Sequence, residues 1–452
     1  MGFPKDFIWG AASASYQIEG AAFEDGRGPS VWDTFSHTKG KVKNEDNGDI
    51  ACDHYHRFRE DVKLMKDMGL KAYRFSISWS RVLPEGIGRI NEDGLSFYSD
   101  LVDELLKAGI EPFITLFHWD LPQALYDKGG WRNRDISDWF AQYTKVVVDA
   151  LSDRVSNWMT LNEPLCHILL GHYLGEHAPG EKVSSTEALR LLHNMNLAHG
   201  KAVQTIRKHA KKPCNIGVVP NPYSGVPATD TKEDLDAARA FTISGTSRGI
   251  FSNGWWLDPL LIGEYPKDGI EAMGNELPAD MIKDGDMEII CQKLDFLGIN
   301  VYTGLVIKHD DVHGYKVCPH RNGYDQNALK WAVVPKVLYY LPKFLYERYK
   351  LPIIVAENGT TLPDWVSLDG KVHDPNRIDY MHRYIKELKR ASMDGIDIRG
   401  YFAWSIMDNF EWSEGYNERF GLIHIDFNTL KRTPKDSYYW YQNLILHNGD
   451  NI

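Results

Sequence analysis

The 452-residue sequence contains few cysteines and no long hydrophobic run. The cysteines number five and form no Cys-x-x-Cys pair; they are Cys52, Cys166, Cys214, Cys291 and Cys318. An odd number of scattered cysteines is typical of a reducing compartment, so we expect a cytoplasmic location and no disulfide framework. No apolar run approaches the roughly 20 residues that a membrane-spanning helix needs. The mean hydropathy is −0.40, and residues 1–10 lack the basic and apolar regions of a secretory signal, so we expect no membrane association.

Positive charge is also in deficit. Lys and Arg total 51 against 62 Asp and Glu, which gives a net charge of −11. Nucleic-acid binders gain most of their affinity from Lys and Arg on phosphates, so we expect no nucleic-acid partner. No Gly-x-Gly-x-x-Gly or Walker-type loop occurs, which removes the simplest nucleotide-binding hypotheses. His54 and His56 are two residues apart in a helical region and do not share a face, so we expect no metal held jointly by these two residues.

Aromatic residues, by contrast, are abundant. They make up 12% of the chain, with 14 Trp and 23 Tyr. Aromatic faces pack well against the C–H faces of sugars, although they fill ordinary cores equally well.

Short β-rich runs alternate with amphipathic helical stretches along the whole chain. No linker rich in Pro, Gly or Ser divides it, so we predict one domain over residues 1–452. Strands that alternate with helices pair in parallel through right-handed crossovers, and eight such units favour a closed barrel. We therefore predict an α/β fold, a single-domain (β/α)₈ TIM barrel whose surplus length forms long βα loops around a deep active-site pocket. The expected strands are 7–13, 72–79, 111–119, 157–162, 215–220, 296–302, 352–356 and 399–405.

Polar and aromatic side chains gather where these expected strands end, which is the catalytic face of such a barrel. A sugar hydroxyl both donates and accepts, so carboxylates, amides and His must converge on it while Trp stacks on the ring. The strand ends carry Gln17, Glu19, Arg74, Trp79, His118, Trp119, Asp120, Asn162, Glu163, Asn221, Asn300, Tyr302, Glu357, Asn358, Trp404 and the run 408–412.

Two of these residues form the minimal apparatus for cleaving a glycosidic bond. Glu163 lies in Thr-Leu-Asn-Glu-Pro and Glu357 in Val-Ala-Glu-Asn-Gly, each directly after an apolar strand. One carboxyl group would protonate the leaving oxygen while the other attacks the anomeric carbon or activates water. Either glutamate alone is equally well explained as an ion-paired strand end, but the pair favours catalysis. The sequence does not fix their separation, so retention and inversion both stay open.

Two other motifs are weaker candidates. The run 245–249 matches the Gly-x-Ser-x-Gly nucleophile elbow, but it follows a helical stretch rather than a strand, so we expect no nucleophile there. Cys166 lies near Glu163 and could act as a nucleophile, although such a cysteine more often packs as a small hydrophobe.

Over essentially its whole length the sequence resembles glycoside hydrolase family 1, the β-glucosidase family. The motifs that carry the resemblance appear in one order, and their combination is far more specific than any single tripeptide. They are Phe-Ile-Trp-Gly at 7–10, Tyr-Gln-Ile-Glu-Gly at 16–20, Tyr-Arg-Phe-Ser-Ile-Ser-Trp-Ser-Arg at 73–81, Leu-Phe-His-Trp-Asp-Leu-Pro at 116–122, Asn-Glu-Pro at 162–164, His-Ala-Pro-Gly at 177–180, Gly-Ile-Asn at 298–300, Glu-Asn-Gly at 357–359 and Asp-Asn-Phe-Glu-Trp at 408–412.

The resemblance implies a TIM barrel that hydrolyses β-glycosides with retention and without metal or cofactor. Its implied substrates are cellobiose-like sugars, other cello-oligosaccharides and aryl or alkyl β-glucosides, from which a terminal β-D-glucosyl residue is removed. Glu163 is the implied acid/base and Glu357 the implied nucleophile, held by Tyr302 and kept ionised by Arg74. The other implied substrate-binding residues are Gln17, His118, Trp119, Asn162, Asn300, Trp331, Trp404, Glu411, Trp412 and Phe420, with Cys166, His167 and Asn221 beside Trp331 on the aglycone side.

The two glutamates need different pKa values for these roles. We expect an adjacent cation to lower the pKa of Glu357, and the anionic Glu357 to raise the pKa of Glu163.

Two alternatives stay open, a 6-phospho-β-glycosidase and a non-catalytic sugar-binding barrel. The run 409–421 lacks the Ser…Lys-x-Tyr pattern of the phosphate-specific branch, but Arg419 could bind a phosphate. The oligomeric state does not follow from the sequence.

Overall fold

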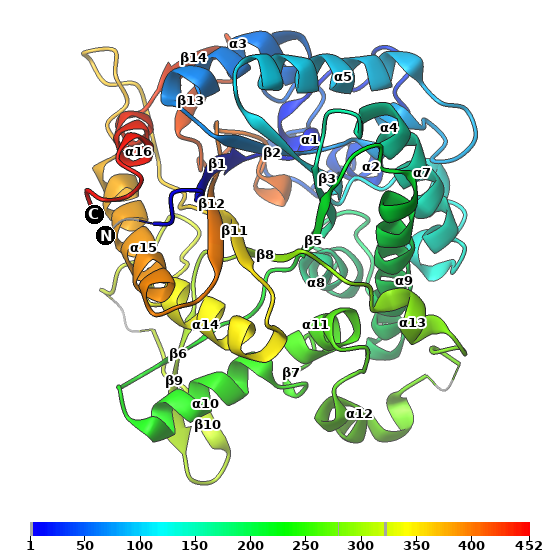
Figure 1. The fold of residues 1–452 in the computed structure, drawn as a ribbon. Coiled ribbons are helices and arrows are strands. Elements are labelled where there is room, and N and C mark those ends of the chain that lie inside the picture. The colour runs from blue at the N-terminus through cyan, green and yellow to red at the C-terminus, as the bar shows by residue number, and fades with distance from the viewer. Residues whose placement is uncertain (1–2, 279, 321–322) are drawn as a thin grey trace.

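Eight parallel strands form a closed barrel at the centre of the computed structural model, which describes residues 3–278, 280–320 and 323–452 (Figure 1). Their order around the barrel follows the chain, and the last strand pairs with the first. Every predicted strand range overlaps one of them, so the predicted TIM barrel is confirmed. The strands are β1 (Ile8–Ala12), β2 (Ala72–Ser76), β3 (Glu111–Phe117), β4 (Asn157–Asn162), β5 (Asn215–Val219), β8 (Phe296–Asn300), β11 (Ile353–Asn358) and β12 (Ile398–Trp404).

Long helices cover the outside of the barrel (Figure 1). The sequence predicts helical stretches over 59–68 and 96–106, and both helices begin several residues earlier. The first turn of α5 contains Glu92 and Asp93, which suit a helix N-terminus but add nothing to an apolar repeat. Gly69 ends α3 in the left-handed region at φ 81°, where glycine is favoured. The long helices are α3 (His54–Met68), α5 (Glu92–Lys107), α7 (Ile136–Leu151), α9 (Ser185–His209), α14 (Val337–Tyr349), α15 (Pro375–Met393) and α16 (Asp436–Leu446).

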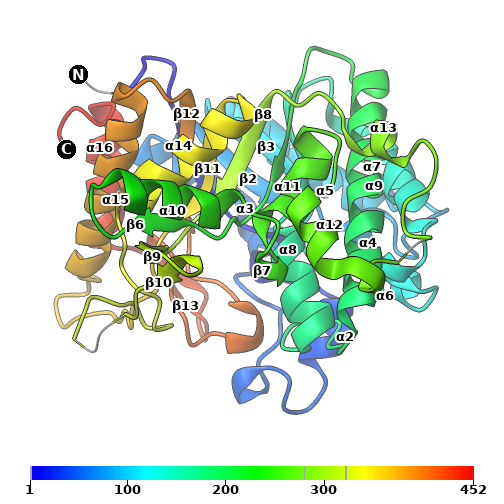
Figure 2. The same cartoon turned by 90° about the horizontal axis from the view of Figure 1, so that it is seen from below.

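The surplus length lies mainly in the βα connections, as predicted. After β5 and β8 the chain builds a small sheet from β6 (Gly225–Pro227), β9 (Leu305–Asp310) and β10 (Gly314–Val317), against which α10 (Lys232–Ile243) packs (Figure 2). After β12 it builds the hairpin of β13 (Ile423–Asp426) and β14 (Lys431–Pro434). The remaining elements are short: α1 (Ser15–Ile18), α2 (Val31–Ser36), α4 (Trp79–Val82), α6 (Gln123–Tyr126), α8 (Pro164–Cys166), a π-helix over His167–Leu174, β7 (Ser247–Ile250), α11 (Asn253–Leu261), α12 (Lys267–Met273), α13 (Asp286–Ile290) and 3-10 turns over Lys43–Glu45, Gly130–Arg132, Gly274–Glu276 and Trp412–Glu414.

Side chains fill the inside of the barrel. A buried cluster there includes Phe113, Met159, Phe296, Ile354 and Phe402, so the barrel is a packed core rather than a pore. In the part of the chain that the structure describes, no helix is both long and apolar enough to cross a bilayer. All five cysteines are free thiols.

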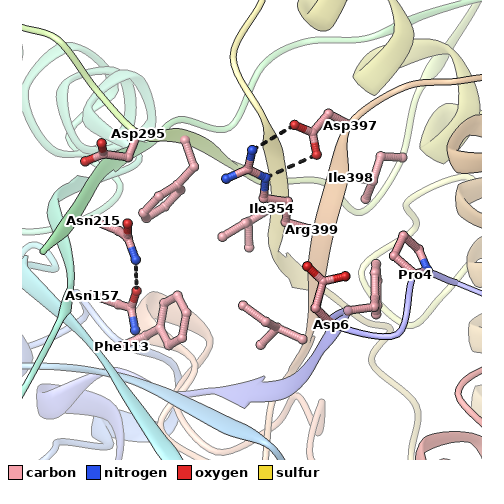
Figure 3. Close-up of a pocket in the computed structure, with 13 residues that line it drawn as sticks. Pro4, Asp6, Phe113, Asn157, Asn215, Asp295, Ile354, Asp397, Ile398 and Arg399 are labelled. Atoms are coloured by element: carbon pink, nitrogen blue, oxygen red, sulfur yellow. Dashed lines mark hydrogen bonds and ion pairs between the residues drawn. The ribbon is translucent and has the colours of Figure 1, made fainter.

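The two mouths of the barrel differ in character. At the end where the strands begin there is a hollow of about 510 Å³, whose rim carries the Arg399–Asp397 ion pair and the Asn215–Asn157 hydrogen bond of 2.9 Å (Figure 3). None of the predicted site residues lines this hollow. They lie at the opposite mouth, where the strands end.

Candidate active site

A cavity of about 490 Å³ opens at the carboxyl ends of the barrel strands. Of the fourteen residues predicted for the site, Gln17, Arg74 and Asn162 lie behind the cavity wall and hydrogen-bond to other members of the set. The other eleven line the cavity: His118, Trp119, Glu163, Asn300, Tyr302, Trp331, Glu357, Trp404, Glu411, Trp412 and Phe420.

Both predicted catalytic glutamates follow an irregularity in strand pairing. The register of β4 against β5 shifts between Met159 and Asn162, and that of β11 against β8 shifts between Val355 and Glu357. Such a shift turns the following side chains away from the regular alternation and is common beside active sites. Glu163 itself has φ 42°, a left-handed conformation that is costly for a residue other than glycine. The backbone of both strands is therefore shaped locally to aim these two carboxyl groups into the cavity.

The end of β11 also explains the glycine of the Glu-Asn-Gly motif. A Cβ atom at Gly359 would lie 1.8 Å from the carbonyl oxygen of Trp404. A side chain at this position would therefore push apart the ends of β11 and β12, which carry Glu357 and Trp404.

Glu357 has a charged or polar partner on each carboxylate oxygen. Arg74 Nη1 donates to its Oε1 at 2.6 Å, and the Tyr302 hydroxyl donates to its Oε2 at 2.6 Å. The Arg74 side chain is wholly buried and the Glu357 side chain is 4% exposed. A carboxylate with a buried cation and a phenol donor is stabilised in its charged form.

Glu163 has a neutral partner instead. Asn300 Nδ2 donates to Glu163 Oε1 at 2.7 Å and also to Asn162 Oδ1 at 3.0 Å. Arg74 Nη2 donates to the same Asn162 oxygen at 2.6 Å. One hydrogen-bond network therefore connects the two glutamates, with the cation at the Glu357 end.

The two glutamates differ in the groups that shift their pKa values. Burial and the charge of Glu357 raise the pKa of Glu163 to about 8, as predicted in direction. Burial also raises the pKa of Glu357, and Arg74 and Tyr302 only partly oppose it, so the expected lowering is wrong in sign. Arg74 and Tyr302 do act to lower the pKa of Glu357, but the loss of hydration outweighs them because this carboxyl group is buried. Arg74 and Tyr302 bind Glu357 directly and favour its charged form, whereas Glu163 has no cation in direct contact.

Buried polar atoms without a protein partner lie at the inner end of the cavity and just behind its wall. Among the described residues, Gln17 Oε1, His118 Nδ1 and Asn300 Oδ1 are buried without a hydrogen-bond partner. Burial and the nearby carboxylates, Glu357 first, raise the pKa of Glu411 well above its usual range. His118 stacks on Trp404 with 5.9 Å between ring centroids. Aromatic faces combined with unpaired donors and acceptors suit a polyhydroxylated ring.

The outer end of the cavity carries the aglycone-side residues that the resemblance implies, with one exception. Trp331 is 37% exposed and lies 5.5 Å from Tyr302 between ring centroids. Cys166 and Asn221 line the cavity. His167 does not: it is buried against Phe117, with 5.3 Å between ring centroids.

Several lining residues escaped the sequence analysis. Tyr223, Ser224 and Arg248 line the outer cavity but belong to connections between barrel strands, where no motif identifies them. Arg248 lies within the run 245–249. The run follows the helix α10, as the sequence predicts, and its serine, Ser247, is the first residue of β7 and does not line the catalytic cavity.

Among the described residues, the structure shows neither a cation placed for a 6-phosphate beside Glu411 nor a cluster that could hold a metal ion. Arg419 Nη1 donates to Asp408 at 2.6 Å and to the carbonyl of Ile425 at 2.9 Å, and it does not line the cavity. A 6-phosphate beside Glu411 would therefore meet a carboxylate with no cation to match it. No group of three or more His, Cys, Asp or Glu side chains in the described ranges is placed to hold a metal ion.

Comparison with known proteins places the chain among characterised relatives. A sequence model described as glycosyl hydrolase family 1 matches residues 1–450. The chain is 47% identical to a 1,4-β-D-glucan glucohydrolase of Thermotoga neapolitana, with 99% of each chain covered. It is 46% identical to β-glucosidase A of Thermotoga maritima, covering 99% of this chain and 98% of that one. Among solved structures, the β-glucosidase from Thermotoga maritima in complex with glucoimidazole superposes with a TM-score of 0.90 at 45% identity, with 99% of each chain covered.

Proposed function

Because the chain belongs to glycosyl hydrolase family 1 and is a retaining β-glucosidase of that family, we propose that Glu357 and Glu163 carry out its double displacement. The observation that carries this proposal is the unlike surroundings of the two carboxyl groups. Glu357 is bound by Arg74 and Tyr302, whereas Glu163 is bound by the neutral Asn300 and has a pKa of about 8. The first is suited to attack as an anion, and the second to give up a proton at neutral pH.

In the first step, a Glu357 oxygen forms a bond to the anomeric carbon while the glycosidic C–O bond breaks. The proton of Glu163 moves to the departing oxygen, so that the aglycone leaves as a neutral alcohol. Tyr302 and Arg74 position the nucleophile, and Asn300 orients the acid.

In the second step, water attacks the anomeric carbon and the bond to Glu357 breaks. Glu163 takes the proton of that water, because the ester has removed the negative charge that raised its pKa. Two inversions at one carbon give net retention, and Glu163 acts as acid and then as base.

The proposed substrates are cello-oligosaccharides, cellobiose among them, and aryl or alkyl β-glucosides, cleaved at the terminal non-reducing glucosyl residue. The relatives named β-glucosidase A and 1,4-β-D-glucan glucohydrolase, and the solved glucoimidazole complex, support this choice. Gln17, His118 and Glu411 are proposed to bind the glucosyl hydroxyls above Trp404. We propose further that the whole chain, residues 1–452, acts as one catalytic unit in the cytoplasm, in keeping with its free cysteines.

A panel of p-nitrophenyl β-glycosides, followed by proton NMR of the sugar first released, tests this function. We expect the glucoside to be hydrolysed, β-glucose to appear before its α anomer, and EDTA to have no effect. First release of α-glucose would contradict double displacement, and loss of activity with EDTA would favour a metal-dependent hydrolase.

A further inference from the structure

A second cavity, of about 340 Å³, adjoins the outer end of the catalytic cavity. Two residues, Arg248 and Leu305, line both cavities. A molecule that extends outward from the catalytic cavity past these two residues therefore enters the second cavity. The second cavity is lined by Leu169, Phe241, Ser247, Arg248, Phe251, Leu305 and Val317.

The connections outside the barrel build this second cavity. Leu169 comes from the π-helix after Glu163, Phe241 from α10, Ser247 and Arg248 from β7, and Leu305 and Val317 from the small sheet. The backbone amide of Leu305 bonds to the carbonyl of Ser224 at 2.8 Å, which fixes the small sheet to the wall of the catalytic cavity. The two cavities are thus held together by hydrogen-bonded backbone.

The lining of the second cavity is mostly apolar. Five of its seven residues are Leu, Phe or Val, and Val317 is 46% exposed. A second sugar ring would need donors and acceptors for each of its hydroxyls, and only Ser247 and Arg248 offer polar side chains here. An alkyl or aryl group has no such requirement and gains free energy by leaving water.

At the junction between the cavities, Arg248 lies against an aromatic ring. The guanidinium of Arg248 lies 3.8 Å above the ring of Tyr223. Among the described residues, Arg248 is the only Arg or Lys that lines the catalytic cavity. A guanidinium held against an aromatic ring is weakly hydrated, so an apolar chain can pass beside it.

We propose that the second cavity binds the apolar end of an amphiphilic aglycone, so that the substrates include β-glucosides of long alkyl or extended aryl alcohols. This proposal rests on the proposed function, since it places the glucosyl group in the catalytic cavity and the aglycone beyond Trp331.

A series of methyl, butyl, hexyl and octyl β-D-glucosides, kept below their micellar concentrations, tests the proposal on the wild-type enzyme. Once the chain passes Arg248, kcat/KM is expected to rise about two- to fourfold for each methylene that enters the cavity. A flat series, or a larger gain from cellobiose to cellotriose than from methyl to octyl glucoside, would overturn the proposal. Hydrolysis of p-nitrophenyl β-glucoside measures the proposed function separately, so that a failure of the catalytic assignment is distinguishable from a failure of the cavity assignment.

A matched pair of variants locates the effect. Val317→Asp puts a carboxylate into the second cavity, whereas Val312→Asp puts one on the turn between β9 and β10, where Val312 is 81% exposed and lines neither cavity. We expect Val317→Asp to lower the octyl-to-methyl ratio of kcat/KM at least about tenfold, and Val312→Asp to leave that ratio unchanged. Equal ratios in the two variants would show that the alkyl chain lies elsewhere and would overturn the proposal.

Discussion

Arg74 and Glu357 form a buried ion pair, with 2.6 Å between Nη1 and Oε1, at the base of the catalytic cavity. The same guanidinium donates to Asn162, whose amide oxygen also accepts from Asn300, the partner of Glu163. A single cation therefore stabilises one glutamate and, through two amides, orients the other. This asymmetry gives two chemically identical carboxyl groups different tasks.

Removal of this cation is predicted to shift the acid limb of the pH profile. Activity needs ionised Glu357, so it falls as the pH drops through the pKa of this carboxyl group. Arg74→Met removes the contact that opposes desolvation, so that pKa rises and the acid limb moves to higher pH. We expect kcat/KM to fall at least about 100-fold, because a buried charge loses its partner. Arg399→Met, which breaks an ion pair at the other mouth of the barrel, is the control and is expected to keep the wild-type profile. An acid limb that stays in place in Arg74→Met would contradict the role of this ion pair.

Replacement of Glu163 is predicted to act on the basic limb. Activity needs protonated Glu163, so it falls as the pH rises through its pKa of about 8. Glu163→Gln cannot ionise and is expected to flatten this limb. It is also expected to slow cellobiose far more than a dinitrophenyl glucoside, because a good leaving group needs little protonation. Equal losses for both substrates would argue against an acid role.

The sugar-binding end is predicted to reject a 6-phosphate. A phosphate there would lie against Glu411, and Arg419 is already bonded to Asp408. We expect a much higher kcat/KM for cellobiose than for cellobiose 6′-phosphate. A preference for the phosphorylated sugar would show that Arg419 leaves Asp408, and would support the 6-phospho-β-glycosidase alternative.

The loop that carries Glu411 is predicted to depend on a buried lysine. Lys435 Nζ lies 2.5 Å from Asp364 and 2.7 Å from Asp408, and Asp408 also accepts from the amide of Gly421 across the base of this loop. Lys435→Met leaves the buried carboxylates with one cation fewer, at a cost of about 3–5 kcal/mol. Urea denaturation at pH 7 measures the loss, with the exposed Lys431→Met as the control. Equal stabilities of the two variants would contradict a stabilising role of Lys435 beside Asp364 and Asp408.

Much of the barrel and of its inner site follows from the sequence, because both depend on local patterns. Apolar runs mark the strands, and residues at their ends share one mouth whatever the loops do. The second cavity could not be predicted from the sequence, because Arg248 and Val317 reach it through loop and sheet packing that leaves no periodic signal. The resemblance implies His167 beside Trp331, but its side chain is buried against Phe117, and a motif does not encode such packing. The sign of the Glu357 pKa shift depends on burial depth, which a motif does not encode.

Covalent labelling tests the central claim, the nucleophilic role of Glu357, most directly. A 2-deoxy-2-fluoro-β-glucoside with a good leaving group forms the glycosyl-enzyme rapidly but hydrolyses slowly, so the intermediate accumulates. Peptide mass spectrometry of the inactivated enzyme should find one fluoroglucosyl group, on the peptide that contains Glu357. Glu357→Ala should take up no label and should recover activity with azide, giving the α-glucosyl azide. A label on a peptide without Glu357, or labelling that survives Glu357→Ala, would contradict the account.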